Sequence, residues 1–165
     1  RQRQMCIRDR LGTYPFSALD PPPRAHKGEV SEEEIIAQVL EYLYGEGASS
    51  LFKGAKVPGK QVLVGEEVVG ELGEDGLVRL NVKGAELLKK SIPPPRARLI
   101  VSGRVGEVIL AQDILLCDEE LRAGQIALVV NQEDELIGVA KLLLSPAEIR
   151  FFREHPAAKL LERAS

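Results

Sequence analysis

Apolar and polar positions alternate most regularly between residues 113 and 149. Three runs rich in Val, Ile and Leu have the length of a β-strand, and short acidic or glycine-containing segments separate them. The runs are Ile114–Cys117, Ile126–Val130 and Leu136–Leu144. The pattern therefore predicts a compact β meander of three strands.

A helix is expected directly after the last of these strands. Ser145 can cap its N-terminus through the hydroxyl group, and Pro146 suits the first helical position because that position needs no N–H. Glu148 has the spacing of a capping box with Ser145. The chain should therefore pass from strand to helix at Ser145.

A second helix is predicted from Ser31, which has capping-box spacing with Glu34, to a stop at Gly45 or Gly47. Apolar residues recur at helical spacing, so that one face should pack on a core. These residues are Ile35, Ile36, Val39, Leu40 and Leu43. We interpret the neighbouring Tyr42 and Tyr44 as packing or rim residues, with stacking on nucleic-acid bases as the alternative.

The period changes to that of strands from Gln61 onward. Residues 61–82 predict three short strands, because glycine-containing turns divide them near Gly65 and at residues 73–76. Residues 83–91 predict a short helix that ends before Pro93. This block is a second meander followed by a helix.

The three prolines at 93–95 predict a stiff extended linker between two blocks of similar size. We expect an α+β protein with a small N-terminal α/β domain at 31–92 and a β-rich domain at 96–155. Residues 156–165 are expected to form a tail or a short helix. The first ten residues, RQRQMCIRDR, lack periodicity and a start methionine and resemble translated adaptor sequence. A disordered or artefactual leader is therefore expected at 1–30, with a genuine basic arm as the alternative.

Composition narrows the class of protein. The 165 residues carry a net charge of −3, and no uninterrupted apolar run approaches the ~20 residues that cross a bilayer. We therefore expect a cytoplasmic protein with no membrane contact. The two cysteines, Cys6 and Cys117, lack the spacing of a disulfide framework or a zinc site, and Cys117 is expected to be a buried thiol.

The sequence offers no pattern typical of catalysis. Its histidines, His26 and His155, have no nucleophile or metal-ligand partner at a recognisable spacing. The glycine-rich segments at 45–60 lack the phosphate-binding spacing GxxxxGK[ST]. We therefore predict no enzyme activity, no cofactor and no metal.

A basic stretch runs from residue 79 to residue 104 in an otherwise acidic body. It holds seven Lys or Arg residues and one acid, Glu86. Such a cluster attracts phosphates by releasing counterions, although lysines on a helix are also typical of an ordinary solvated face. The cluster comprises Arg79, Lys83, Lys89, Lys90, Arg96, Arg98 and Arg104.

Residues 96–152 resemble the C-terminal part of a PUA domain, the small RNA-binding module of pseudouridine synthases and archaeosine transglycosylases. Residues 122–125 match its turn, with Gln125 in place of the usual aspartate. Residues 126–130 match the following strand, 132–135 the acidic hairpin, 137–141 the next strand and 145–149 the helix start. The resemblance implies a PUA-like β-barrel and contact with RNA.

The two-domain layout is similar to that of the Nip-type ribosome-assembly factors of archaea and eukaryotes. This similarity implies a non-enzymatic protein that binds structured RNA, rRNA or tRNA, in ribosome biogenesis, with ribosome-assembly proteins as further partners. We expect phosphate contacts from the basic cluster, and secondary contacts from Lys141, Arg150 and Arg153 on the PUA-like side.

Two alternatives to a role in ribosome assembly remain. The acidic body and the exposed sheet edges could serve a protein-interaction module. The chain could also be the PUA targeting fragment of a tRNA- or rRNA-modifying enzyme whose catalytic part precedes it.

Overall fold

The N-terminal block begins with a helix. The computed structural model describes residues 30–164, so residues 1–29 of the predicted leader lie outside the described residues, with Cys6 and His26 among them. Helix α1 (Glu32–Tyr44) confirms the predicted element, and three glutamates in its first turn suit the helix dipole. Its buried face carries Ile36, Leu40 and Tyr44. Tyr44 is therefore a core residue, as the packing interpretation expects.

A three-stranded antiparallel sheet follows, in the order β1-β2-β3. The strands β1 (Gln61–Val64), β2 (Glu67–Leu72) and β3 (Val78–Leu80) confirm the second predicted meander. Helix α2 (Val82–Ser91) starts at Asn81, whose side chain accepts a hydrogen bond from the Gly84 backbone N–H. A Cβ atom on Gly84 would lie 2.1 Å from the carbonyl oxygen of Val69, so the glycine lets α2 approach β2.

The three prolines do not form the extended linker that the sequence predicts. The Arg96 backbone N–H donates to the carbonyl of Pro93, and the Arg98 N–H donates to the carbonyl of Pro95. Ala97 has a φ of 66°, in the left-handed region. The two backbone hydrogen bonds fold the chain into a tight turn. This turn brings Arg98 close to the end of α2.

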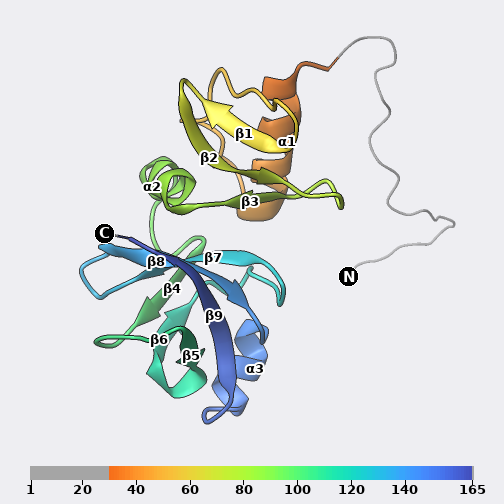
Figure 1. Cartoon of the computed structure of the whole chain (residues 1–165). Helices are drawn as coiled ribbons and strands as arrows, with labels where there is room; N and C mark the ends of the chain where they lie inside the picture. The colour runs from red at the N-terminus through yellow and green to blue at the C-terminus, as the bar shows by residue number, and fades with distance from the viewer. Residues whose placement is uncertain (1–29, 165) are drawn as a thin grey trace, which may run out of the picture. The chain divides into compact units, whose positions relative to one another are not determined.

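The C-terminal half forms a six-stranded sheet that curls on itself, in the order β5-β9-β8-β7-β4-β6 (Figure 1). The six strands are β4 (Arg98–Val101), β5 (Val108–Leu110), β6 (Ile114–Cys117), β7 (Ile126–Val130), β8 (Leu136–Leu142) and β9 (Pro156–Arg163). A short 3-10 turn, η1 (Ala111–Asp113), links β5 to β6.

The meander predicted for residues 114–144 is wrong in its pairing. Strands β7 and β8 form the expected hairpin, but β4 lies between β6 and β7. It pairs with β6 antiparallel and with β7 parallel. Every residue of β7 is buried. A buried central strand needs a hydrogen-bonding neighbour on each side, and β4 fills the position that sequence order assigned to β6.

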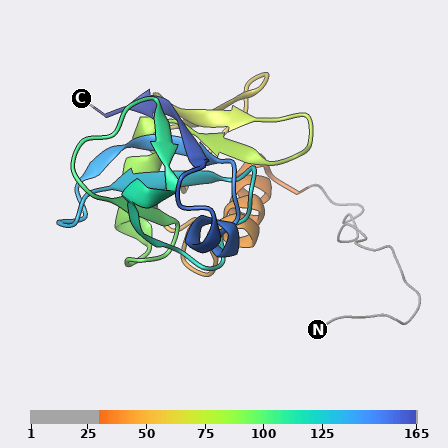
Figure 2. The same ribbon diagram turned by 90° about the horizontal axis from the view of Figure 1, so that it is seen from below.

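Helix α3 (Pro146–Phe151) confirms the predicted capping box between Ser145 and Glu148. Residues 156–163 contradict the prediction of a tail or short helix, because they form β9, which pairs with β5 and β8 (Figure 2). Residues Ala157, Ala158 and Leu160 are buried. The chain therefore continues the sheet beyond α3.

One cluster of buried side chains contains residues from the segments before and after the three prolines. Side-chain hydrogen bonds also join these two segments. The Tyr44 hydroxyl donates to the Ile126 carbonyl at 2.8 Å, and the Gln125 amide donates to the Leu43 carbonyl at 2.8 Å. The Val82 N–H donates to the Glu162 carboxylate. The proposed division into domains at 93–95 stays a prediction.

Within residues 30–164 the helices are all too short or too polar to cross a bilayer. The longest of those named above, α1, has 13 residues, whereas a membrane-spanning helix needs about 20.

Candidate nucleic-acid interface

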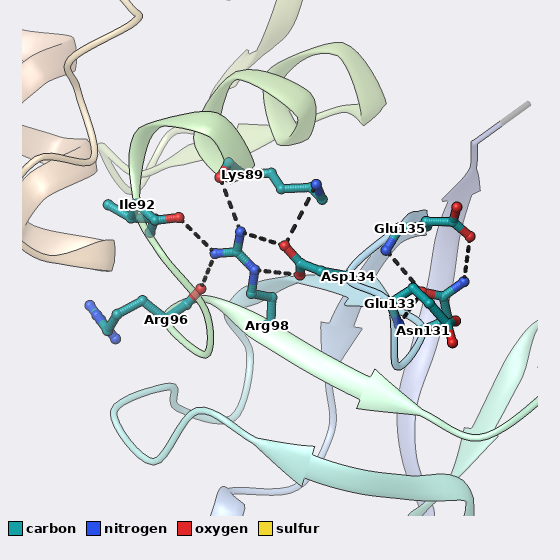
Figure 3. A network of polar contacts seen from close by, with 8 residues as sticks. All are labelled: Lys89, Ile92, Arg96, Arg98, Asn131, Glu133, Asp134 and Glu135. Carbon is teal, nitrogen blue, oxygen red and sulfur yellow. Dashed lines mark hydrogen bonds and ion pairs between the residues drawn. The ribbon is translucent and has the colours of Figure 1, made fainter.

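Arg98 is the most deeply buried charged side chain of the predicted basic cluster, with 1% of its surface exposed. Its guanidinium donates to the Asp134 carboxylate at 2.9 and 3.3 Å. It also donates to the backbone carbonyls of Lys89, Ile92 and Arg96 at 2.9–3.0 Å (Figure 3). These five bonds use all of its donors internally and leave none for a phosphate, so the structure gives the predicted phosphate contact of Arg98 no support.

Arg96 shares this turn, but its side chain points away from Arg98 (Figure 3). It forms an ion pair with the buried carboxylate of Asp118 through Nη1. The same carboxylate accepts the backbone N–H groups of Ala97 and Glu120 at 2.7 and 3.0 Å. Only one edge of the Arg96 guanidinium is occupied in this way, and the side chain retains 24% exposure.

Five other predicted residues already have internal partners at the surface. Four are in ion pairs: Arg79 with Asp75, Lys83 with Glu67, Lys89 with Asp134 and Arg150 with Glu119. Arg153 donates to the backbone carbonyls of Ile149, Gln112 and Ile114. Exposed ion pairs contribute ~0–1 kcal/mol, so a phosphate can compete for these cations. The four ion-paired sites nevertheless present little uncompensated charge, whereas Arg153, which bonds only to neutral carbonyls, keeps its charge.

The pair formed by Arg79 illustrates this compensation. The pKa of Asp75 lies below its ordinary value, chiefly because the Leu77 backbone N–H donates to the carboxylate, with a further contribution from the Arg79 charge. A carboxylate that stays ionised at lower pH keeps neutralising its arginine. Arg79 is therefore one of the weaker candidates for a phosphate contact.

Three of the predicted residues, Lys90, Arg104 and Lys141, are exposed and form no ion pair with any described residue. Lys141 lies on β8, directly opposite Lys159 of β9 in the antiparallel register, and Lys159 is likewise exposed and unpaired within residues 30–164. Two like charges opposite each other on adjacent strands repel, so this pairing is destabilising unless an anion lies between them.

The loop 102–107, which carries Arg104, lies against the same strand β9. The Leu160 N–H donates to the Glu107 carbonyl at 2.7 Å, and the Arg163 side chain donates to the Val105 carbonyl at 2.8 Å. Arg104, Lys141 and Lys159 therefore come from adjoining elements, and we call them the β8–β9 basic group. Figures 1 and 2 both show β8 and β9 running side by side.

Lys159 was not among the residues that the sequence singled out. Its segment was expected to be a tail or a short helix, and PAAKLLER lacks the strict alternation of apolar and polar residues that would have indicated a strand. Most charges of the predicted cluster at 79–104 face internal carboxylates or carbonyls, and its action as one RNA-binding surface stays a prediction.

Groups that could carry other chemistry are sparse in the described part of the chain. No set of three or more His, Cys, Asp or Glu residues there could hold a metal ion. His155 is exposed, and its ring lies 5.1 Å from that of Phe152 in an edge contact. Cys117 is a buried free thiol, and burial together with the charges of Asp118 and Glu119 raises its pKa to about 12. A thiol of this kind is a poor nucleophile near neutral pH.

Comparison with known proteins gives clear sequence relatives. No protein-family model matches the chain. The tRNA-guanine(15) transglycosylase of Pyrococcus abyssi is 32% identical over 164 residues, covering 90% of this chain and 28% of the relative. That of Thermococcus kodakarensis is 30% identical, with the same coverage. That of Methanocaldococcus jannaschii is 36% identical over 102 residues, covering 58% of this chain. The chain thus spans 28% of the length of the first two relatives.

Solved structures with a similar fold share little sequence. A hypothetical protein from Pyrococcus horikoshii superposes with a TM-score of 0.63 and 16% identity, over 80% of this chain and 91% of that one. A conserved PUA domain protein from Thermoplasma acidophilum gives 0.53 and 16%, over 81% and 91%. The fold is thus mixed α and β with a PUA-like curled barrel, as the resemblance implies. The Nip-type kinship is not supported, because the sequence similarity is to tRNA-guanine(15) transglycosylases.

Proposed function

We propose that this chain is a non-catalytic tRNA-binding module of the kind that serves a tRNA-guanine transglycosylase. The observation that carries the proposal is the sequence similarity to tRNA-guanine(15) transglycosylases, which covers 90% of the chain, combined with the PUA-like fold. The module supplies RNA binding and no bond chemistry. This proposal takes the place of the expected role in ribosome assembly, for which the comparisons give no support.

The β8–β9 basic group supports this function physically. Phosphate contacts provide much of the affinity of RNA-binding proteins, and they come from cations whose charge is not neutralised internally. Arg104, Lys141 and Lys159 meet this condition within the described residues, whereas Arg98 does not. A phosphate between Lys141 and Lys159 would also relieve their mutual repulsion. Lys90 is a further candidate contact.

The proposal is tested by tRNA binding to the whole chain, measured by fluorescence anisotropy between 50 and 200 mM salt. We expect affinity for a tRNA transcript to fall steeply with salt, and to exceed affinity for an rRNA fragment of equal length. The double variant Lys141→Glu/Lys159→Glu should weaken binding by roughly ten-fold or more and lower the salt slope by about two.

The matched control is Lys53→Glu/Lys56→Glu, which reverses two exposed, unpaired lysines in the segment between α1 and β1. We expect this control to lose no more than a few-fold in affinity, because it changes net charge equally without touching the basic group. Absence of tRNA binding by the wild-type chain would refute the proposed function. Equal effects of the two double variants would remove the β8–β9 basic group from the proposal while leaving tRNA binding in place.

A further inference from the structure

A pocket of about 670 Å³ opens between the end of α1 and the turn at residues 118–125 that leads into β7. Its volume falls within the ~300–1,000 Å³ typical of small-ligand sites. Leu43, Leu77 and Gly45 contribute to its lining, and the turn contributes Glu120 and Arg122. The pocket is separate from the β8–β9 basic group, since none of that group lines it.

An exposed aromatic ring stands at this pocket. Tyr42 is 70% exposed, whereas Tyr44, two residues further along the same helix, is buried and bonded to the Ile126 carbonyl. Because helical periodicity places these two side chains on different faces, only Tyr44 serves the core. Tyr42 leaves a flat π surface available. Such rings stack on unpaired nucleobases regardless of sequence.

The polar groups of the pocket divide into occupied and available ones. The Glu41 carboxylate accepts the Ser49 hydroxyl at 2.7 Å, and Glu119 pairs with Arg150. Among the described residues, the carboxylate of Glu120 and the guanidinium of Arg122 have no hydrogen-bond or ion-pair partner. The pocket thus offers one free acceptor and one free cation beside one exposed aromatic ring.

The turn that presents these groups is held in place by its own contacts. The Gln125 side chain accepts the Arg122 backbone N–H at 3.0 Å and donates to the Leu43 carbonyl of α1. The Gly124 N–H donates to the Leu142 carbonyl of β8 at 2.7 Å, with a left-handed φ of 91°. A preorganised site loses less conformational entropy when a ligand binds.

We propose that this pocket binds a single unstacked nucleotide of the RNA that the module recognises. Tyr42 stacks on the base, the Glu120 carboxylate accepts from a base amino or imino group, and Arg122 contacts the adjoining phosphate. The three groups match the face of the base, its hydrogen-bonding edge and the adjoining phosphate, whereas a fully paired duplex withholds the face and the Watson–Crick edge of every base. This inference rests on the proposed function and adds to it the recognition of a nucleotide outside a helix.

The test uses the absence of tryptophan from the chain. The Tyr42→Trp variant keeps a stacking ring and provides a single tryptophan signal, which we expect tRNA to quench. The matched control is Phe151→Trp, which places the probe at another exposed aromatic position, 82% exposed and outside the pocket lining. We expect no quenching there, and none in Tyr42→Trp when the ligand is a fully paired RNA duplex.

Binding measurements complete the test. We expect Tyr42→Ala to weaken tRNA binding by roughly ten-fold, as loss of one base stack does, without changing the salt slope. Tyr42→Phe should retain the affinity. If the wild-type chain binds tRNA but Tyr42→Ala binds equally well and Tyr42→Trp is not quenched, the pocket proposal is wrong while the proposed function survives. If the wild-type chain does not bind tRNA, the proposed function itself fails.

Discussion

Replacing Arg98 by methionine separates an internal role for this arginine from a role in RNA contact. Methionine has a similar length and no hydrogen-bond donor, so the substitution removes all five bonds of the guanidinium while leaving little empty space. Three backbone carbonyls, those of Lys89, Ile92 and Arg96, lose their side-chain donor. The Asp134 carboxylate loses its buried partner.

The expected cost follows from these groups. A buried polar group left without a partner costs ~1–3 kcal/mol. The bond to the Ile92 carbonyl is buried, and those to the Arg96 and Lys89 carbonyls are partly buried. Asp134 is 31% exposed and keeps Lys89 nearby, so its loss is partly compensated by solvent. We expect Arg98→Met to lower the free energy of unfolding by about 3–4 kcal/mol. With a urea m-value of about 1–3 kcal/mol/M, the unfolding midpoint should fall by roughly 1–4 M.

Equilibrium urea unfolding of the whole chain measures this change. The control is Arg79→Met, which removes an arginine that is 50% exposed and paired only with Asp75; its cost should stay within about 1 kcal/mol. The double variant Arg98→Met/Asp134→Asn should cost less than the sum of the single changes, because the orphaned charge is removed with its partner. Equal losses for Arg98→Met and Arg79→Met would refute the internal role and return Arg98 to the candidate phosphate contacts.

Two further outcomes follow from packing and from ionisation. Gly84→Ala should destabilise the protein by about 1–3 kcal/mol in urea unfolding, because the new Cβ would lie 2.1 Å from the Val69 carbonyl and this overlap outweighs the ~1 kcal/mol gain in helix propensity. Gly106→Ala, in open space, should change stability little. Burial raises the pKa of the Cys117 thiol to about 12, so the folded state favours the neutral thiol. Stability should therefore be fully present below the ordinary thiol pKa of about 9 and fall as pH rises from there toward 12. Between pH 8 and pH 10.5, the free energy of unfolding measured in urea should fall by about 1–2 kcal/mol less in Cys117→Ala than in the wild-type chain. Identical pH profiles of the two proteins would contradict this.

Local elements were predictable because their signals lie within a few residues of each other. The capping box at Ser145 needs only Glu148, and the helix stop needs only the proline at 93. Strand pairing was not predictable in this way. The insertion of β4 beside β7 joins Leu99 to Val129, and no pattern within either strand records that partnership.

Which cations of the candidate site are free of an internal partner was not predictable for a related reason. Net charge along residues 79–104 counts each cation as free, whereas the fold decides which ones meet a carboxylate. Asp134 lies far along the chain in the β7–β8 turn, yet it neutralises Arg98 and Lys89. Lys159 gains its significance only from its register with Lys141. Clusters assembled across strands leave no signature in a local charge count.

The strand β9 also governs when the barrel can form. Within the described sheet β5 has one neighbour, β9, and Val108 of β5 pairs with Lys159 near the other end of the half. During synthesis β5 therefore emerges long before the strand that satisfies its hydrogen bonds. The sheet β1-β2-β3 has only local pairings and can close early, whereas contacts between distant segments slow folding. The chain must have emerged from the ribosome as far as Arg163, the last residue of β9, before the barrel can close. Until then β5 has an unpaired edge to which a chaperone or another nascent chain can bind.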